Sequence, residues 1–287
     1  MATRALVVGG TSGIGYAIAS QIAASNPNSH VTISGRRKPT TPLPSNMEFR
    51  QLDASSMRAI KRYTDEYKSS RSEPHLDLLV MSQGILSTAG RTETPEGIDN
   101  KMALHYYGRQ LLLRELTPVL KGDAKVVIVL DSVRGTPDKV LWDDMDLKKN
   151  FSLSNAANHC MAMNDAMVQF YAAQQKGDGS GLNRHYVHAY PGFVKTDLGS
   201  GMPWYLRPVI KGAGALLAVS PETCAEHILT GTTEAAAAGE KEGRFWSNID
   251  SKGKVALGRP VWTTEQMQKV ADHTWKIVDE AIEKPEN

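Results

Sequence analysis

The sequence of 287 residues has few cysteines, no long hydrophobic run and almost no net charge. Its two cysteines, Cys160 and Cys224, lie far apart and neither belongs to a Cys-x-x-Cys pair, so we expect neither a metal site nor a disulfide framework. No stretch of 18 apolar residues is present, which argues against a membrane span. With 33 Lys and Arg against 31 Asp and Glu, the net charge of +2 argues against nucleic-acid binding, which needs a concentrated basic face.

The first apolar run is also too short for a secretion signal. Residues 5–8 are apolar and are followed directly by glycines, whereas the core of a signal peptide is longer. Hydrophobic residues make up 41% of the chain and charged residues 22%, which is the composition of an ordinary globular protein. These features favour a cytoplasmic protein.

Short β-branched runs alternate along the chain with stretches of helical spacing. The expected strands are residues 5–8, 30–34, 76–81, 124–130 and 185–189, and the expected helices are residues 14–25, 56–67, 98–120 and 154–176. This alternation predicts parallel strands joined by right-handed crossovers, and so an α/β fold with a Rossmann-like, doubly wound parallel sheet. Because no linker divides the chain, we expect one domain over residues 1–287.

The strongest motif is a glycine loop between the first expected strand and the first expected helix. Its glycines follow the spacing Gly-x-x-x-Gly-x-Gly within residues 9–15. Glycines let the backbone approach a pyrophosphate, and a helix N-terminus offers free N–H groups and the positive end of its dipole. The loop therefore predicts a dinucleotide site. Its expected contacts are Gly9, Thr11, Ser12, Gly13, Ile14 and Gly15.

This loop resembles that of the short-chain dehydrogenase/reductase family, and four further motifs fall at matching places. Asp53 follows the third strand, where the family's Asp contacts adenine, and Gly84 matches the last residue of the family's Asn-Asn-Ala-Gly. Ser132 matches the catalytic serine, and residues 190–196 match the Pro-Gly-x-Val-x-Thr segment that wraps the nicotinamide. The resemblance covers about residues 4–198. It implies cofactor contacts from Pro191, Gly192, Val194 and Thr196.

The end of the second strand indicates which cofactor is bound. An acidic residue there would bind the ribose 2′-hydroxyl of NAD. This strand ends instead in Gly35-Arg36-Arg37-Lys38, and guanidinium groups suit a 2′-phosphate. We therefore expect NADP(H), held by Arg36 and Arg37, with a solvated basic turn as the alternative.

The catalytic pair of the family, Tyr-x-x-x-Lys on one helical face, is missing. None of the nine tyrosines is followed four residues later by a lysine. Residues 141–147 resemble a tryptophan–aspartate insertion of retinol-dehydrogenase-like members, which puts Asn158 and Ala162 at the Tyr and Lys positions. A shift of one residue gives His159 and Met163 instead. The family's Asn is replaced by His105, so only the serine of the four catalytic residues is kept.

Three residues are the expected catalytic candidates: Ser132 first, then His105 and Asp165. Histidine titrates near neutral pH, and a carboxylate beside a buried cofactor can have a raised pKa and act as an acid. Asp165 shares a helical face with the Tyr and Lys positions. For both His105 and Asp165 a structural role is the alternative. The imidazole of His159 and the phenols of Tyr106, Tyr107 and Tyr190 could also supply a proton, while Asp131 and Arg134 are expected to form a structural ion pair.

The C-terminal part, residues 198–287, is expected to form a lid and closing elements. The apolar stretch 199–219 corresponds to the family's segment over the substrate, which favours a hydrophobic substrate; core or subunit packing is the alternative. Ser220 and Pro221 predict a helix start, with a helix over 220–229, a strand over 243–247 and a last helix over 264–283.

The resemblance implies an NADPH-dependent oxidoreductase that reduces a carbonyl, imine or activated alkene of a hydrophobic small molecule. The alternatives are an isomerase, lyase or cyclase on the same fold, or a non-catalytic NADPH-binding protein. In lacking the Tyr and the Lys, this chain is similar to non-canonical members of the family in secondary metabolism. Family members usually pair through the two helices placed here at 98–120 and 154–176, which implies a homodimer or homotetramer.

Overall fold

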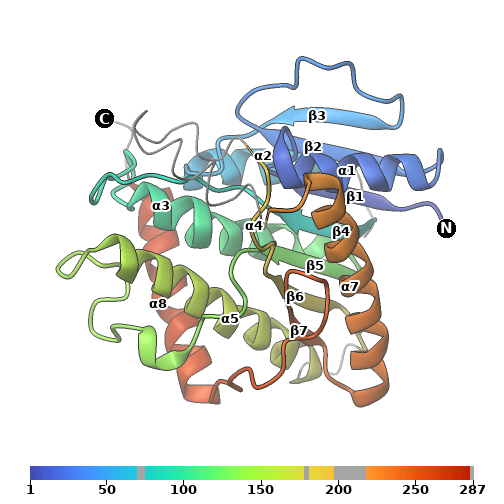
Figure 1. The fold of residues 1–287 in the computed structure, drawn as a ribbon. Coiled ribbons are helices and arrows are strands. Elements are labelled where there is room, and N and C mark those ends of the chain that lie inside the picture. Colours follow the sequence, from blue (N-terminus) through green and yellow to red (C-terminus); the bar gives the residue numbers. More distant parts are fainter. Residues whose placement is uncertain (70–74, 178–180, 197–217, 285–287) are drawn as a thin grey trace.

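The computed structural model describes residues 1–69, 75–177, 181–196 and 218–284, and its centre is a parallel sheet with helices on both faces (Figure 1). The strand order is β3-β2-β1-β4-β5-β6-β7, and every neighbouring pair is parallel. The order reverses between β1 and β4, and ligands of such sheets bind at the carboxyl ends of the strands beside this point. The strands are β1 (Arg4–Val8), β2 (His30–Gly35), β3 (Met47–Gln51), β4 (Leu76–Met81), β5 (Leu120–Val129), β6 (His185–Ala189) and β7 (Trp246–Ile249).

Two hydrophobic cores lie on opposite faces of the sheet, because successive side chains of a strand point to opposite sides. Leu6 and Val8 of β1 join the core with α2, α4 and α5, whereas Ala5 and Val7 join the core with α1 and α7. The helices are α1 (Gly13–Ser25), α2 (Met57–Ser69), α3 (Asn100–Met102), α4 (Gly108–Leu116), α5 (Leu153–Gly177), α7 (Pro221–Glu242) and α8 (Thr264–Glu283), with a π-helix at Ala103–Tyr107 and 3₁₀ turns at Thr117–Val119 and Pro137–Lys139.

The expected α/β fold is confirmed, but three predicted elements were wrong in their extent. The helix expected over 98–120 is divided into α3, a π-helix and α4, and it ends at Leu116 because Pro118 turns the chain toward β5. α7 continues past residue 229 to Glu242 and ends at Gly243, whose φ of 64° suits glycine. The last strand covers 246–249 and not 243–247. No helix of the described ranges is long and apolar enough to cross a bilayer.

The last helix, α8, packs over the helices that family members use for pairing. It begins with a capping box of Thr263 and Gln266, and its buried face includes Val270 and Val278. The hydroxyl groups of Tyr106 and Tyr107 lie 2.5 Å from Thr274 Oγ1 and 2.9 Å from His273 Nε2 of α8. A homodimer or homotetramer through α4 and α5 stays a prediction.

The expected lid falls largely outside the described residues. Of the stretch 199–219, the structure describes only residues 218 and 219. Val219 forms a parallel bridge with Val194, where its N–H donates to Phe193 O and its carbonyl accepts from Lys195 N–H. This bridge fixes the described end of the stretch beside the segment that follows β6.

Candidate active site

The glycine loop fits tightly against the segment that follows β4. Gly9 has a φ of 80°, and a Cβ there would lie 2.5 Å from Gln83 N. A Cβ on Gly15 would overlap Gly9 O and Ser82 Oγ. Gly13 has a φ of 54°, and a Cβ there would lie 3.2 Å from Thr196 Cγ2. The structure thus brings the loop together with Thr196, and only glycine fits its two closest approaches.

The N-terminus of α1 is open to an anion. Its N-cap residue, Ser12, has an extended backbone and makes no side-chain cap hydrogen bond, and the first turn contains no acidic residue. The first N–H groups of a helix lack backbone partners, and they lie at the positive end of the helix dipole. This N-terminus and the glycine cradle fit the pyrophosphate of a dinucleotide.

The end of β2 carries exposed cations beside the glycine loop. Thr11 packs against Gly35, where an added Cβ would lie 2.8 Å from Thr11 Oγ1. Arg36 and Arg37 are exposed, and neither forms an ion pair with a carboxylate of the described residues. Asp53 is exposed as well, and its Oδ1 accepts hydrogen bonds from Ser55 N at 3.0 Å and Ser55 Oγ at 2.6 Å. The residues expected to hold the adenosine half of the cofactor therefore share one edge.

Asp165 is fully buried, and both of its carboxylate oxygens are occupied. Oδ1 accepts hydrogen bonds from His188 Nδ1 at 2.8 Å and from Asn248 Nδ2. Oδ2 accepts from Arg259 Nη2 at 3.1 Å. A fully buried carboxylate that three side chains hold from within the protein is placed to support the fold, so the geometry favours the structural alternative over a proton donor.

Ser132 is buried beside this network, and its hydroxyl is directed to β7. Ser132 Oγ donates to Ile249 O at 2.7 Å, and Asn248 Nδ2 donates to Ser132 O at 2.9 Å. Arg259 also donates to the carbonyls of Val133 and Gly135. The Asp165 network therefore anchors the loop that follows β5, and it holds Ser132 in a fixed position.

His105 lies in the π-helix, against the glycine that ends the segment after β4. A Cβ on Gly84 would lie 2.6 Å from His105 Cε1. His105 Nε2 lies 2.9 Å from Ile85 O and 3.2 Å from Ile85 N, while Nδ1 is buried with no partner among the described residues. Burial and the Arg109 guanidinium lower the pKa of His105 to about 4. The ring is therefore neutral at pH 7, and it can offer a hydrogen bond more readily than a proton.

Arg109 is a buried cation that the sequence interpretation missed. Among the described residues its guanidinium donates to backbone carbonyls alone, namely Leu104 O at 3.3 Å, Val129 O at 2.9 Å and Gln83 O at 2.6 Å. Burial lowers its pKa to about 10. Both polar atoms of the Gln83 side chain are buried without a partner in the described part of the chain. The feature of the sequence that could have identified Arg109 is its position as a charged residue within an apolar helical run. In the structure Arg109 joins the ends of β4 and β5.

The remaining candidates are held by contacts elsewhere in the fold. His159 Nε2 accepts from Leu141 N–H at 2.9 Å and its Nδ1 lies 3.1 Å from Met145 O, so His159 supports the 141–146 loop. Arg134 Nη1 and Asp131 Oδ2 are 3.4 Å apart, as the expected ion pair requires. Tyr190 is half-buried at the carboxyl end of β6. Unlike Tyr106 and Tyr107, it lies at the edge that carries the glycine loop.

The segment expected around the nicotinamide is fixed by its neighbours. Gly192 has a φ of 68°, and a Cβ there would lie 2.7 Å from Ser251 Cβ. Cys224 Sγ lies 3.6 Å from Pro191 O, and burial raises the pKa of this thiol to about 12. Asn158 is half-buried and Ala162 is fully buried, and neither carries an ionisable group.

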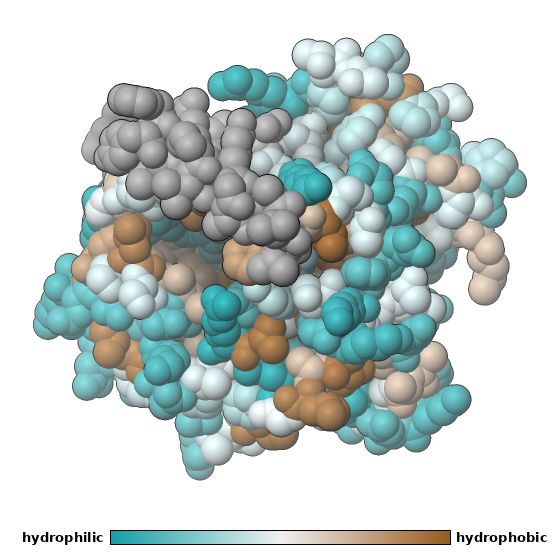
Figure 2. Space-filling view, viewed as in Figure 1, coloured by the Kyte–Doolittle hydropathy of each residue, from teal (hydrophilic) through white to brown (hydrophobic). Residues whose placement is uncertain are grey.

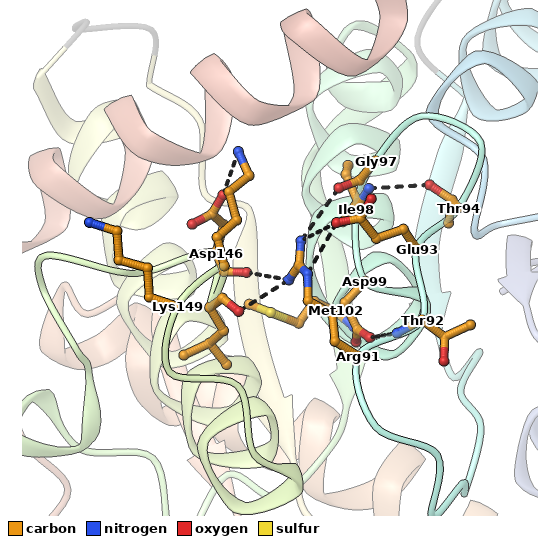
Figure 3. A network of polar contacts seen from close by, with 12 residues as sticks. Arg91, Thr92, Glu93, Thr94, Gly97, Ile98, Asp99, Met102, Asp146 and Lys149 are labelled. Carbon is orange, nitrogen blue, oxygen red and sulfur yellow. Dashed lines mark hydrogen bonds and ion pairs between the residues drawn. The ribbon is translucent and has the colours of Figure 1, made fainter. Parts of the chain in front are cut away.

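A second polar network, drawn in Figure 3, lies apart from the predicted site residues. Arg91 Nη1 donates to Asp146 O at 2.8 Å and to Leu147 O at 3.3 Å, and its Nη2 lies 3.0 Å from Glu93 Oε1. These contacts border a cavity of about 320 Å³ between the 91–99 loop and α8. The network ties the insertion before α5 to α3, and it contains none of the residues expected to bind cofactor. No cluster that could hold a metal ion occurs in the described ranges.

Comparison with known proteins gives one consistent result. Residues 3–142 match the family model described as short chain dehydrogenase. An oxidoreductase of Emericella nidulans is 31% identical over 205 residues, which cover 68% of this chain and 59% of that protein. The polyprenol dehydrogenase of Homo sapiens is 27% identical over 237 residues, which cover 76% of this chain and 68% of that protein. The NADPH-bound carbonyl reductase from chicken fatty liver shares the fold, with a TM-score of 0.62 and 17% identity over 89% of this chain and 98% of that chain.

Proposed function

This chain belongs to the short-chain dehydrogenase family of oxidoreductases, and we propose that it uses NADPH to reduce a carbonyl, imine or activated alkene of a hydrophobic small molecule. The observation that carries this proposal is the cradle of Gly9, Gly13 and Gly15 beside the open N-terminus of α1. A cradle in which a Cβ on Gly9 or Gly15 would collide with neighbouring backbone suits close approach of a pyrophosphate.

The preference for NADPH over NADH rests on the end of β2. Arg36 and Arg37 are exposed there, and no described carboxylate occupies the place where one would bind a ribose 2′-hydroxyl. Guanidinium groups bind phosphate with paired hydrogen bonds. The carbonyl reductase with the same fold is described as NADPH-bound, in line with this preference.

When bound, the nicotinamide would supply the hydride, and the residues of this chain would orient the acceptor beside it. Pro191–Thr196 would hold the nicotinamide half of the cofactor. Because Gly84 has no side chain, it would leave room for the nicotinamide to approach along His105. In the tautomer that carries its proton on Nδ1, with Nε2 accepting from Ile85 N–H, the neutral imidazole of His105 would polarise the acceptor through Nδ1, the ring atom without a partner among the described residues. Water would supply the proton that a carbonyl or alkene takes up together with the hydride. Ser132 and Asp165 would act as positioning residues, because they fix the loop after β5. An iminium acceptor is already cationic and would need no proton from the protein.

A hydrophobic substrate is supported by the apolar side chains around the carboxyl edge. Val133, Phe193 and Leu257 are exposed on the loops that follow β5, β6 and β7. The relative named polyprenol dehydrogenase indicates that such a substrate is compatible with the family. This chain spans 59% of the length of the Emericella nidulans oxidoreductase and 68% of the length of the polyprenol dehydrogenase.

Cofactor binding without turnover is the second candidate, and two contacts favour it. Ser132 Oγ donates to Ile249 O, and both carboxylate oxygens of the buried Asp165 accept from side chains of the protein. Both groups are therefore directed into the protein. A non-redox isomerase, lyase or cyclase remains an alternative of the same kind, because it too would keep the cofactor cradle.

The cofactor assignment is tested by titrating NADPH and NADH into wild type, Arg36→Ala and the control Arg4→Ala, with binding followed by fluorescence. Removing a hydrogen bond to a charged group costs about 1.5–3 kcal/mol, so Arg36→Ala should weaken NADPH binding by at least tenfold. Binding of NADH should stay unchanged, and Arg4→Ala, which is exposed at the opposite edge, should match wild type. Equal loss for both cofactors would reject the phosphate assignment.

The reductase assignment is tested by NADPH consumption against a panel of ketones, enones and imines. Oxidation of NADPH with at least one class supports reduction. Binding of NADPH without oxidation by any class supports the second candidate. Failure to bind either cofactor overturns both.

A further inference from the structure

The exposed large hydrophobic side chains are not spread evenly over the molecule. Apart from Met1, the described residues of this kind all lie on loops or helix starts that follow the carboxyl ends of strands. These residues are Leu86, Val133, Leu141, Leu153, Phe193, Leu257 and Val261. Single exposed apolar side chains are ordinary, but their segregation to one edge marks an interaction surface.

The three most exposed of them lie on the loops after β6 and β7, which touch each other and the loop after β5 that carries Val133. Phe193 follows β6 and is 62% exposed, while Leu257 and Val261 follow β7 and are 91% and 76% exposed. The first two loops meet where a Cβ on Gly192 would lie 2.7 Å from Ser251 Cβ. Arg259 joins the third loop by donating to Val133 O. We call these four exposed side chains, Val133, Phe193, Leu257 and Val261, the apolar rim.

Exposed cations surround the apolar rim. Arg134 and Lys254 are 68% and 70% exposed and pair with Asp131 and Glu234, whereas Lys195 and Lys252 are exposed with no carboxylate partner among the described residues. The described carboxylate of the loops after β6 and β7, Asp250, accepts hydrogen bonds from the backbone N–H groups of residues 252 and 254. The surface therefore has apolar side chains at its centre and two lysines without a described carboxylate partner beside them, and a lipid surface with anionic headgroups complements both features.

Figure 2 shows the same character on the face in view, where brown side chains lie among teal ones over the part in which Figure 1 places β6, β7 and α5. We propose that the apolar rim and its cations dock the carboxyl edge of the sheet onto an anionic lipid surface. The apolar side chains enter the headgroup region and the lysines contact the headgroup phosphates. The edge that carries the glycine loop and Pro191–Thr196 then faces the lipid, from which a hydrophobic molecule can be taken up directly.

The test is cosedimentation of the full chain with vesicles of phosphatidylcholine alone or with added phosphatidylserine, in the absence of cofactor and acceptor. Its outcome therefore does not depend on the proposed reductase. Wild type should bind the anionic vesicles, bind neutral ones less, and lose binding as salt is raised. Protein that stays in the supernatant with both vesicles overturns the proposal.

Variants distinguish binding through this surface from non-specific binding to vesicles. Lys252→Gln should lower partition about fivefold, which corresponds to about 1 kcal/mol for a cation near an anionic bilayer. Leu257→Ser should lower it about tenfold on both kinds of vesicle, because the side chain leaves water on binding. The matched control is Lys241→Gln on the last turn of α7, at the opposite edge, which should bind as wild type does. Equal effects of Lys241→Gln and Lys252→Gln would contradict the assigned surface.

Discussion

The carboxyl edge of β1, β2 and β4 differs sharply from that of β5, β6 and β7. The first is formed by glycines, backbone N–H groups and exposed arginines, which leaves it open to a ligand. The second is filled by the side chains of Asp165, His188 and Arg259, in which the Asp165 carboxylate accepts hydrogen bonds from both partners, while His188 Nε2 and Arg259 Nε are buried without a partner among the described residues. The two halves therefore differ in kind: the first presents backbone and cations at its surface, whereas the second encloses a carboxylate within an internal polar network.

The largest expected effect comes from opening the network of the second half with Asp165→Ala. Removing one partner of a buried charge cluster leaves the others unpaired, and we expect a loss of about 3–5 kcal/mol in the free energy of unfolding, measured by urea denaturation at pH 7. NADPH affinity of the folded protein should be kept, because the first half forms the cradle.

The control for this prediction is Asp143→Ala, since Asp143 is exposed in the same insertion that precedes α5. Its substitution should change stability by less than about 0.5 kcal/mol. If Asp165→Ala behaved like the control, or if it abolished NADPH binding while the protein stayed folded, the contrast between the two halves would be wrong.

The same contrast explains how much could be predicted from the sequence. The glycine loop and the strand pattern are local, so the fold and the expected cofactor edge could be inferred from neighbouring residues. The partners of Asp165 are 23, 83 and 94 residues away in the chain, and no local pattern connects them. Arg109 binds only carbonyl groups, which every residue has, so its partners have no sequence signature.

The boundaries of two predicted helices were wrong. The helix expected over 220–229 continues through the Ala-rich stretch 235–238 to its glycine cap, because alanine has the highest helix propensity. Within 98–120, the π-helix leaves no mark in the apolar periodicity, although it positions His105 beside Gly84.

An intermediate effect is expected in the first half from Gly9→Ala. The added Cβ would lie 2.5 Å from Gln83 N at a φ of 80°, so either the loop or the segment after β4 must shift. We expect a loss of about 1–3 kcal/mol in stability and a much larger relative loss of NADPH binding, measured by thermal unfolding and fluorescence titration.

Gly90→Ala is the matched control, because a Cβ on Gly90 would meet nothing within 4 Å and the residue has no positive φ. It should leave both stability and NADPH binding unchanged. A Gly9→Ala variant that binds NADPH normally would show that the cradle does not hold the cofactor, and the distinction between the halves would lose its functional meaning.

The effect that is smallest at neutral pH comes from the other end of the second half, where a buried histidine changes stability only below about pH 6.5. His185, at the start of β6, is 2% exposed, and its Nε2 lies 2.9 Å from Ser247 Oγ. Burial, with the cations Arg244 and Lys125, lowers its pKa to about 4 from an ordinary value near 6.5. Between these values the unfolded chain binds a proton that the native protein does not. Stability is therefore complete above pH 6.5 and falls by about 1.4 kcal/mol per pH unit toward pH 4.

Replacing His185 with Gln should remove the contribution of this titration, so the slope of unfolding free energy against pH becomes shallower by the same amount. Ser247→Ala removes the hydrogen bond to His185 and should lower stability equally at every pH. Urea denaturation at several values between pH 4 and 7 measures both slopes. Because burial lowers the pKa of His105 as well, the His185→Gln variant should keep part of the pH dependence. Identical slopes for wild type and His185→Gln would place the pH dependence elsewhere, and a shallower slope for Ser247→Ala would assign it to the hydrogen bond and not to the titration of the ring.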